Sequence, residues 1–310
     1  MSVNAAHFKP LRALLYLVCA QVLFTLLDAT GKLLARDMGI PLISLARHGG
    51  QLLLMAIVLG PSLGRVLIRT RHPWLQLLRG VVLSGFTLFF FTALQRLPQA
   101  DATAINFIAP FLVMLLVGPI LGETVTTARW SGAAVGFLGM LAVVRPGAAL
   151  DSIGVMFVLL TVVCNVGFQL LTRKLAAVEN SFTTLFLSAA IGVIASLATL
   201  PLQSVWGGWP QTLSAHQLTL LLSLGCTGAI SQWCFIRAYY WSSASFIAPL
   251  VFLQLLWAVA SGWWFFGQFP DAISLAGMVL ILSGGIGSMW VDARAHRRGR
   301  ALNLEAAVDR

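Results

Sequence analysis

Residues 11–34, LRALLYLVCAQVLFTLLDATGKLL, and residues 152–171, SIGVMFVLLTVVCNVGFQLL, decide the fold predicted for this sequence. Both stretches are apolar and close to the roughly 20 residues that an α-helix needs to cross a bilayer. They correspond at an offset of 145 residues, because Val18-Cys19 in the first recurs as Val163-Cys164 in the second. The second half of the chain therefore repeats the first. The same offset relates Gly80 to Gly225, Ala93 to Ala238, and Gly132 to Gly277.

Five membrane-length stretches follow one another in each half. Because five is odd, the second half is expected to enter the membrane from the opposite side, as in the inverted repeats of many secondary transporters. The prediction is an all-α membrane protein with ten transmembrane helices in two inverted five-helix repeats. Residues 1–148 form the first repeat, residues 149–291 the second, and residues 292–310 a charged cytoplasmic tail. The expected helices are Leu11–Leu34, Leu42–Leu59, Trp74–Leu94, Ala100–Leu121, Thr127–Val144, Ser152–Leu171, Phe182–Leu200, Ala215–Ala238, Ser243–Phe266 and Ala272–Val291.

Composition supports a polytopic membrane protein. The 310 residues are 58% hydrophobic and only 10% charged, whereas soluble domains carry about 25% charged residues. The four cysteines lie inside apolar stretches without a CxxC pair, so neither a disulfide framework nor a zinc site is indicated. No P-loop, HExxH or GxSxG motif is present, which argues against ATP-driven transport and against an enzyme. We expect no cofactor and no metal.

The positive charge is distributed as in an inner-membrane protein. A net charge of +10 would suit a nucleic-acid partner, but most basic residues fall in loops on one side of the predicted membrane. Of the 20 Lys and Arg residues, fifteen lie on the side of both termini, Arg79 being counted there as a loop residue, and five lie on the other. Because cytoplasmic loops are enriched in Lys and Arg, both termini are predicted to be cytoplasmic in a bacterial-type plasma membrane.

A motif near the end of each half resembles a known family. The first half contains Leu121-Gly122-Glu123, then Arg129-Trp130 before Gly132, and closes with Arg145-Pro146-Gly147. The second half echoes it with Phe246–Leu250, Phe266-Gly267-Gln268 and Gly277. This pattern resembles the EamA repeat of the drug/metabolite transporter superfamily. Gln268 replaces the acid of the motif in the second half, which argues against a role that needs an acid in both repeats.

The resemblance implies transport of small metabolites. Members similar to this chain export amino acids, and one branch exports aromatic amino acids. Others carry sugars, nucleotide sugars and purine-like compounds.

Polar side chains follow one face of the first helix of each half. In the first half they are Gln21, Thr25, Asp28 and Lys32, which are three or four residues apart and therefore share a face. Asn165 and Gln169 occupy the corresponding helix of the second half. Polar residues inside a membrane usually face the bundle interior. They either line a central path for a solute or join the helices by hydrogen bonds.

A Phe-Ile-Ala-Pro motif occurs in the fourth and ninth predicted helices, ending at Pro110 and at Pro249. Proline cannot bond the carbonyl four residues earlier, which belongs to Asn106 in the first motif and to Ser245 in the second. Freed carbonyls at membrane depth are tolerated where they line a cavity or gain another partner. The motifs predict kinks that shape a binding cavity or that neighbouring helices simply satisfy.

Charged residues near the helix ends are candidates for solute contact or gating. Asp28 is suited to bind a substrate ammonium or to carry a proton. The alternative is that Asp28 only forms an ion pair with Lys32, one helical turn away. Arg47 and His48 enter the second helix at the same level and are candidates for an outer gate. The alternatives are that Arg47 snorkels to the interface and that His48 is a packing residue. Glu123 is either a helix-capping acid or an inner gate.

Aromatic residues are dense in the third and eighth predicted helices. Phe91 and Trp233 lie in these helices near the polar residues Thr87 and Gln232. Side chains that share a face with such polar groups would form an apolar pocket for a bulky solute. The alternative is that the aromatic residues face lipid or fill the core.

The sequence predicts a secondary transporter that exports small amphipathic metabolites, in the first place amino acids and among them aromatic ones, by alternating access through a central cavity. Its expected partners are a small-molecule substrate and the lipid bilayer, with proton coupling left open, no nucleic acid, and a monomer or weak homodimer. A translocator of lipids, lipid-linked sugars or nucleotide-type solutes with the same fold is the alternative. A membrane-embedded enzyme or sensor is a third reading, for which Asp28 with His48 is the candidate constellation.

Overall fold

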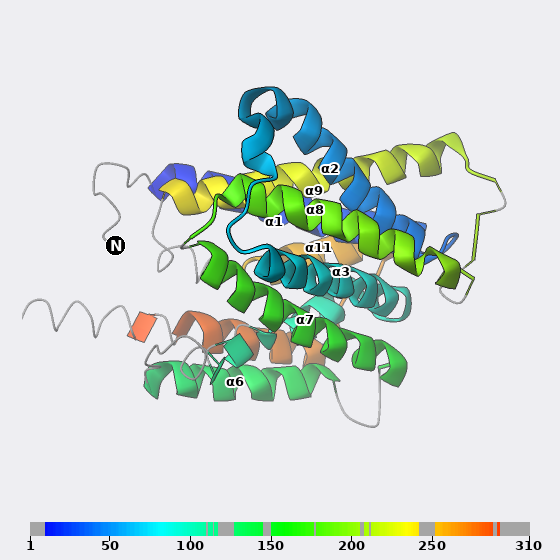
Figure 1. Ribbon diagram of the computed structural model, residues 1–310. Coiled ribbons are helices and arrows are strands. Elements are labelled where there is room, and N and C mark those ends of the chain that lie inside the picture. Colours follow the sequence, from blue (N-terminus) through cyan, green and yellow to red (C-terminus); the bar gives the residue numbers. More distant parts are fainter. Residues whose placement is uncertain are drawn as a thin grey trace, which may run out of the picture.

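The computed structural model describes residues 10–109, 111–113, 115–116, 127–144, 150–176, 178–204, 208–210, 212–241, 252–287 and 290–291. Within these ranges the regular elements are all helices (Figure 1). The first half contains α1 (Pro10–Leu34), α2 (Ile40–Leu63), the 3-10 turn η2 (Gly64–Leu67), α3 (Pro73–Arg96), α4 (Gln99–Asn106) and α6 (Thr127–Val144). The second contains α7 (Ser152–Ala176), α8 (Ser181–Thr199), η3 (Leu200–Leu202), α9 (Ala215–Trp241), α11 (Gln254–Phe266) and a C-terminal helix, Ala272–Gly287.

Six helices are long and apolar enough to cross a membrane: α1, α2, α3, α7, α8 and α9. Their bounds agree with the predicted ones to within a few residues, and α6 begins and ends at the predicted residues. The helix predicted over residues 100–121 is different, since α4 ends at Asn106 and a turn follows at Phe107-Ile108. The chain is helical again over 111–113 and 115–116. The interruption lies just before Pro110, whose missing N–H cannot continue the hydrogen-bond ladder.

The long helices pack in pairs that join the two halves of the chain. α1 lies along α9, and α3 lies along α7. α2 contacts both α8 and α9, whereas α8 contacts both α2 and α3. The short helices follow the same pattern, because α11 packs on α1 and α4 packs on α7. In the repeat, α1 is equivalent to α7, α2 to α8, α3 to α9 and α4 to α11. When each helix is exchanged for its equivalent, every contact in this set becomes another contact of the set or stays the same.

Glycines allow the closest helix approaches. A Cβ added at Gly277 would lie 2.6 Å from the Gly139 carbonyl oxygen, and one added at Gly284 would lie 2.6 Å from that of Gly132. These contacts hold α6 and the C-terminal helix side by side in the lower part of Figure 1. The offset of 145 residues converts Gly132 into Gly277 and Gly139 into Gly284. When each glycine is replaced by its equivalent in the other half, one of these two contacts becomes the other.

The outer surface of the bundle is apolar, as a lipid-facing surface should be. Exposed side chains on it include Ile57 on α2, Val163 on α7 and Trp264 on α11. The interior combines large apolar residues, such as the fully buried Phe91 and Leu94, with many polar ones. These buried polar side chains define the candidate site.

Candidate functional site

The polar face of α1 points into the bundle. Gln21, Thr25 and Lys32 are buried, and Asp28 is half-buried. The α1 backbone is also tied to α4, because Gln99 Nε2 donates to the Thr25 carbonyl oxygen at 3.1 Å. Helix α11 joins the same group. Its Ser261 hydroxyl donates to Gln99 Oε1 at 3.0 Å.

Arg47 and His48 of α2 lie inside the bundle beside this face. Arg47 is only 5% exposed, and its guanidinium carbon lies 5.8 Å from the centre of the Phe91 ring. Arg47 is therefore buried and does not snorkel to the interface. His48 is 1% exposed, and Gly192 of α8 makes room for it, since a Cβ there would lie 2.6 Å from the imidazole ring. Asp28 is close enough to Arg47 for the two charges to interact.

Lys32 does not pair with Asp28, so that alternative is wrong. Its ammonium donates to the Leu97 carbonyl oxygen at 2.6 Å and to Gln268 Oε1 at 3.1 Å, and it lies 4.9 Å from the Phe266 ring centre. Gln268, the residue that replaces the acid of the second-half motif, thus serves as a neutral acceptor. A cavity of about 240 Å³ adjoins this group; it is lined by Lys32, Ala35, Arg36, Leu94, Gln95, Arg96, Leu97, Pro98 and Gln268.

The polar residues of α7 meet the end of α4. Asn165 Nδ2 donates to Asn106 Oδ1 at 3.2 Å, and Gln169 Nε2 donates to Asn165 Oδ1 at 3.1 Å. Three of the residues singled out in the sequence therefore form one hydrogen-bonded chain. It lies where α4 is interrupted.

Arg79 of α3 is a second buried arginine, so its assignment to a loop was wrong. It is 3% exposed and lies 4.5 Å from the Phe168 ring centre, measured from its guanidinium carbon. Its Nε donates to the Thr172 hydroxyl at 2.8 Å, and its Nη1 bonds the Ser188 hydroxyl. The sequence could have predicted that Arg79 is buried, because Arg79 lies inside the predicted Trp74–Leu94 helix and follows Gln76 by three residues, on the same helix face.

The remaining predicted residues are dispersed. Thr87 is fully buried and donates to the Leu83 carbonyl oxygen of its own helix at 3.0 Å. Gln232 is half-buried. Trp233 is 42% exposed and packs edge-on against Tyr16, with 5.7 Å between ring centres. Since Tyr16 precedes Asp28 by twelve residues, it lies about 18 Å from it along α1. Pro110, Glu123, Ser245 and Pro249 lie outside the described residues.

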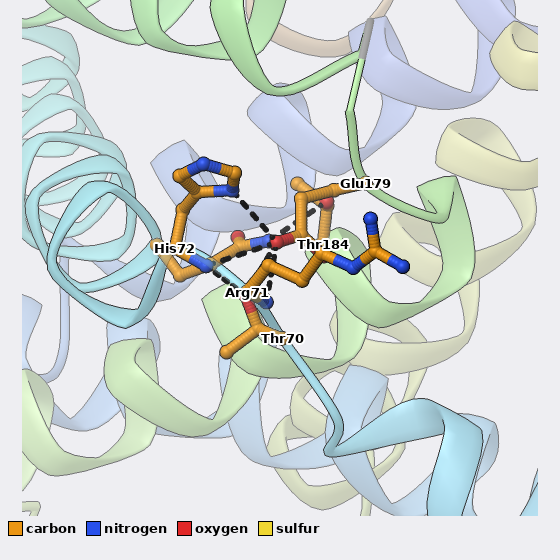
Figure 2. Close-up of polar contacts among 6 residues, drawn as sticks. Thr70, Arg71, His72, Glu179 and Thr184 are labelled. Atoms are coloured by element: carbon orange, nitrogen blue, oxygen red, sulfur yellow. Dashed lines mark hydrogen bonds and ion pairs between the residues drawn. The ribbon is translucent and has the colours of Figure 1, made fainter.

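A hydrogen-bonded clasp joins the α2–α3 loop to the α7–α8 loop (Figure 2). Glu179 Oε1 accepts from the Thr70 hydroxyl at 2.8 Å, from the Arg71 amide at 2.7 Å and from the His72 amide at 3.1 Å. The His72 ring Nδ1 lies 3.2 Å from the same oxygen. Burial alone would raise the pKa of Glu179, but these hydrogen bonds outweigh it and lower the pKa. Glu179 was not among the residues predicted for the site.

Replacing Glu179 with alanine should destabilise the protein by about 1–3 kcal/mol at neutral pH, because the amides of Arg71 and His72 lose a charged acceptor. A lowered native-state pKa stabilises the fold above the unfolded carboxyl pKa and loses that effect as pH falls through the native value. The difference between the wild type and Glu179→Ala should therefore shrink below about pH 4. Thermal unfolding in detergent at pH 7 and pH 3.5 measures it. A difference that does not depend on pH would contradict the clasp.

A second clasp closes the opposite end of the bundle, between the α1–α2 and α8–α9 loops. The Gly39 amide donates to the Gly208 carbonyl oxygen at 2.9 Å, and the Leu42 amide donates to Gln203 Oε1 at 3.2 Å. Gln203 also donates through Nε2 to Gly208 at 2.9 Å, and Gly208 adopts the left-handed conformation with φ of 78°. In both clasps a loop that follows the second helix of one half binds a loop that follows the first helix of the other.

Comparison with known proteins relates this chain to one protein family and its fold to a solved structure. The model of the EamA-like transporter family matches residues 11–145 and again residues 152–290. A solved crystal structure superposes with a TM-score of 0.66 over 93% of this chain and 99% of its own, at 17% identity, which shows a shared fold.

Three relatives carry transporter names. The S-adenosylmethionine uptake transporter of Rickettsia conorii is 26% identical over 236 residues, 76% of this chain and 78% of its own. The riboflavin transporter of Rhizobium johnstonii is 28% identical over 305 residues, 96% and 98% of the two chains. The pseudopaline exporter of Pseudomonas aeruginosa is 29% identical over 230 residues, 74% and 79%. These similarities point to a small-molecule transporter rather than an enzyme, and the chain, a multi-pass membrane protein, belongs to the EamA-like transporter family.

Proposed function

We propose that this protein is a secondary transporter whose solute binds between the polar faces of α1 and α7 and crosses by alternating access. The main support for this proposal is the set of polar side chains that are buried inside an otherwise apolar bundle. Arg47, His48 and Thr25 are buried, yet each has a polar atom without a hydrogen-bond partner among the described residues. Such groups are costly in a membrane unless a solute or water satisfies them in some state of the protein.

Two inverted five-helix repeats, residues 1–148 and 149–291, would supply the moving parts. The exchanged helix pairs and the exchanged contacts of Gly132 and Gly139 support a two-fold relation between the halves. In inverted-repeat transporters, one half or bundle rocks against the other around a fixed site. The proposal keeps ten membrane helices and places both termini in the cytoplasm of the bacterial inner membrane.

The two clasps are the proposed gates. Each joins loops from both halves, and they lie at opposite ends of the bundle. Rocking that opens one end must break the clasp at that end while the other persists. Glu179 would then belong to the inner gate and Gln203 to the outer gate. Arg47 and His48 would lie deeper, inside the path itself.

The proposed substrates are small amphipathic metabolites, with amino acids, including aromatic ones, as the first class to test. S-adenosylmethionine carries an amino-acid group and a planar purine, and riboflavin carries a planar ring system. Arginine side chains that lie over aromatic rings, as Arg47 does over Phe91 and Arg79 over Phe168, form planar polar surfaces suited to such groups. Export remains the proposed direction.

Counterflow into proteoliposomes tests this proposal. Vesicles are preloaded with one unlabelled compound, and uptake of its radiolabelled form is measured for tryptophan, phenylalanine, threonine, S-adenosylmethionine and riboflavin, with and without a pH gradient. We expect saturable accumulation of at least one amino-acid-containing compound. Accumulation of riboflavin alone would reassign the substrate class, and movement of a fluorescent lipid alone would favour a lipid translocator. No movement of any of these compounds would contradict the transporter proposal.

A further inference from the structure

Asp28 and Arg47 lie at the same depth of the bundle. Asp28 precedes the end of α1 by six residues, and Arg47 follows the start of α2 by seven. At 1.5 Å per residue, both side chains attach about 10 Å inside the same end. Their charges interact, yet no nitrogen–oxygen distance of 4.0 Å or less joins them in the described part of the chain. A carboxylate and a guanidinium are thus held near each other without forming an ion pair.

Four further buried polar atoms of α1 and α2 have no hydrogen-bond partner among the described residues. Arg47 Nη1, both ring nitrogens of His48 and the Thr25 hydroxyl are buried and make no hydrogen bond among the described residues. Gly31 of α1 packs directly on the Phe91 ring, the same ring that supports Arg47. The guanidinium therefore rests on an aromatic surface and has one buried donor, Nη1, that makes no hydrogen bond among the described residues.

We propose that Asp28 and Arg47 are the two poles of a binding site for a zwitterionic α-amino acid group. Arg47, with its neighbour His48, binds the carboxylate, and Asp28 binds the ammonium, while Thr25, one turn before Asp28 on α1, offers a further hydroxyl. This inference rests on the proposed transport function and names the chemical group that its site recognises. The side chain or purine of the solute would extend along the path beyond these poles.

Charge balance favours a zwitterion over a simple anion or cation. Asp28 and Arg47 supply one charge of each sign, and the ammonium of Lys32, one turn further along α1, is directed to the Leu97 carbonyl and to Gln268. A monoanion or a monocation bound between them would leave one uncompensated charge in a membrane interior, where such charges are costly. A zwitterion adds one charge of each sign and leaves the site neutral. The guanidinium is also the side chain best shaped to hold a carboxylate through two hydrogen bonds.

Equilibrium binding to the purified full-length protein in detergent tests the site separately from transport. The probes are radiolabelled tryptophan, phenylalanine, threonine, methionine and S-adenosylmethionine. For whichever probe binds, the competitors are its decarboxylated and its deaminated analogues, such as tryptamine and indole-3-propionate for tryptophan. We expect the zwitterion to bind, and each analogue to compete at least about 30-fold less well.

The variants Arg47→Gln and Asp28→Asn should each weaken binding by about 30-fold or more. Arg47→Gln should also abolish the preference over tryptamine, and Asp28→Asn the preference over indole-3-propionate. Arg65→Gln and Asp37→Asn, which change the same charges at exposed positions, should bind as the wild type does. If a single variant fails to fold, the competition by the two analogues on the wild-type protein decides between the outcomes.

The outcomes separate the two proposals. Competition by either analogue as strong as that by the unlabelled zwitterion, or no binding of any amino-acid-containing probe, would overturn the zwitterion site even if riboflavin moves in counterflow. Zwitterion-selective binding without counterflow of any compound would support the site and overturn the transport function.

Discussion

Replacing Arg47 with methionine should lower the free energy of unfolding by about 3 kcal/mol and reduce transport by about 100-fold. Methionine keeps an unbranched, largely apolar side chain, but it is shorter and lacks the guanidinium, so both the charge and the guanidinium contact with Phe91 are removed. Asp28 then remains inside the bundle without the opposing charge, and an uncompensated carboxylate at membrane depth is costly. Thermal unfolding in detergent and counterflow of the transported compound measure the two losses.

The double variant Asp28→Asn/Arg47→Met is the control that separates charge balance from solute recognition. With both charges absent, most of the lost stability should return, because no uncompensated charge remains inside the bundle. Transport should not return, since neither pole of the site is present. Recovery of transport together with stability would show that the pair serves the fold alone.

Gly50→Ala should destabilise the protein by about 2 kcal/mol. A Cβ at this position would lie 2.6 Å from the Cα of Gly225, so that α2 meets the backbone of α9 rather than a side chain that can rotate away. The two helices would have to separate. Folding yield and unfolding temperature in detergent report the effect.

Gly49→Ala is the matched control on the same helix. Its nearest neighbour would be Val193 Cγ2 at 4.0 Å, an ordinary van der Waals contact. Because alanine also favours a helix over glycine by about 1 kcal/mol, this variant should be neutral or slightly stabilised. Equal losses from both substitutions would contradict the close approach of α2 and α9.

The sequence was sufficient to predict most helices because their signal is local. Apolar stretches of membrane length, bounded by residues such as Pro73 and Gly267, define helix ends without reference to the rest of the fold. The interruption of the 100–121 helix was also local, since Pro110 marks it. The proposed polar path was partly predictable for the same reason, because Asn165 and Gln169 share a helix face and meet Asn106.

Contacts between distant segments were not predictable from spacing. Helix periodicity suggested that Asp28 pairs with Lys32, one turn away, but Lys32 reaches Leu97 and Gln268 in the folded chain. Arg79 was treated as a loop charge, although hydroxyls of α7 and α8 satisfy it. The Glu179 clasp depends on two loops separated by about a hundred residues. Such partners are set by how the two halves pack.

Cysteine accessibility tests the central claim, that a solute passes between the polar faces of α1 and α7. Single cysteines are placed at Thr25 and Asn165 after Cys19, Cys164, Cys226 and Cys234 are replaced, with Val163→Cys as the lipid-facing control at nearly the same depth. An impermeant thiol reagent is applied to either side of proteoliposomes, with and without the transported compound. We expect both path positions to react from both sides and the compound to slow the reaction, whereas position 163 stays unreactive. Path cysteines that react from neither side would contradict the account.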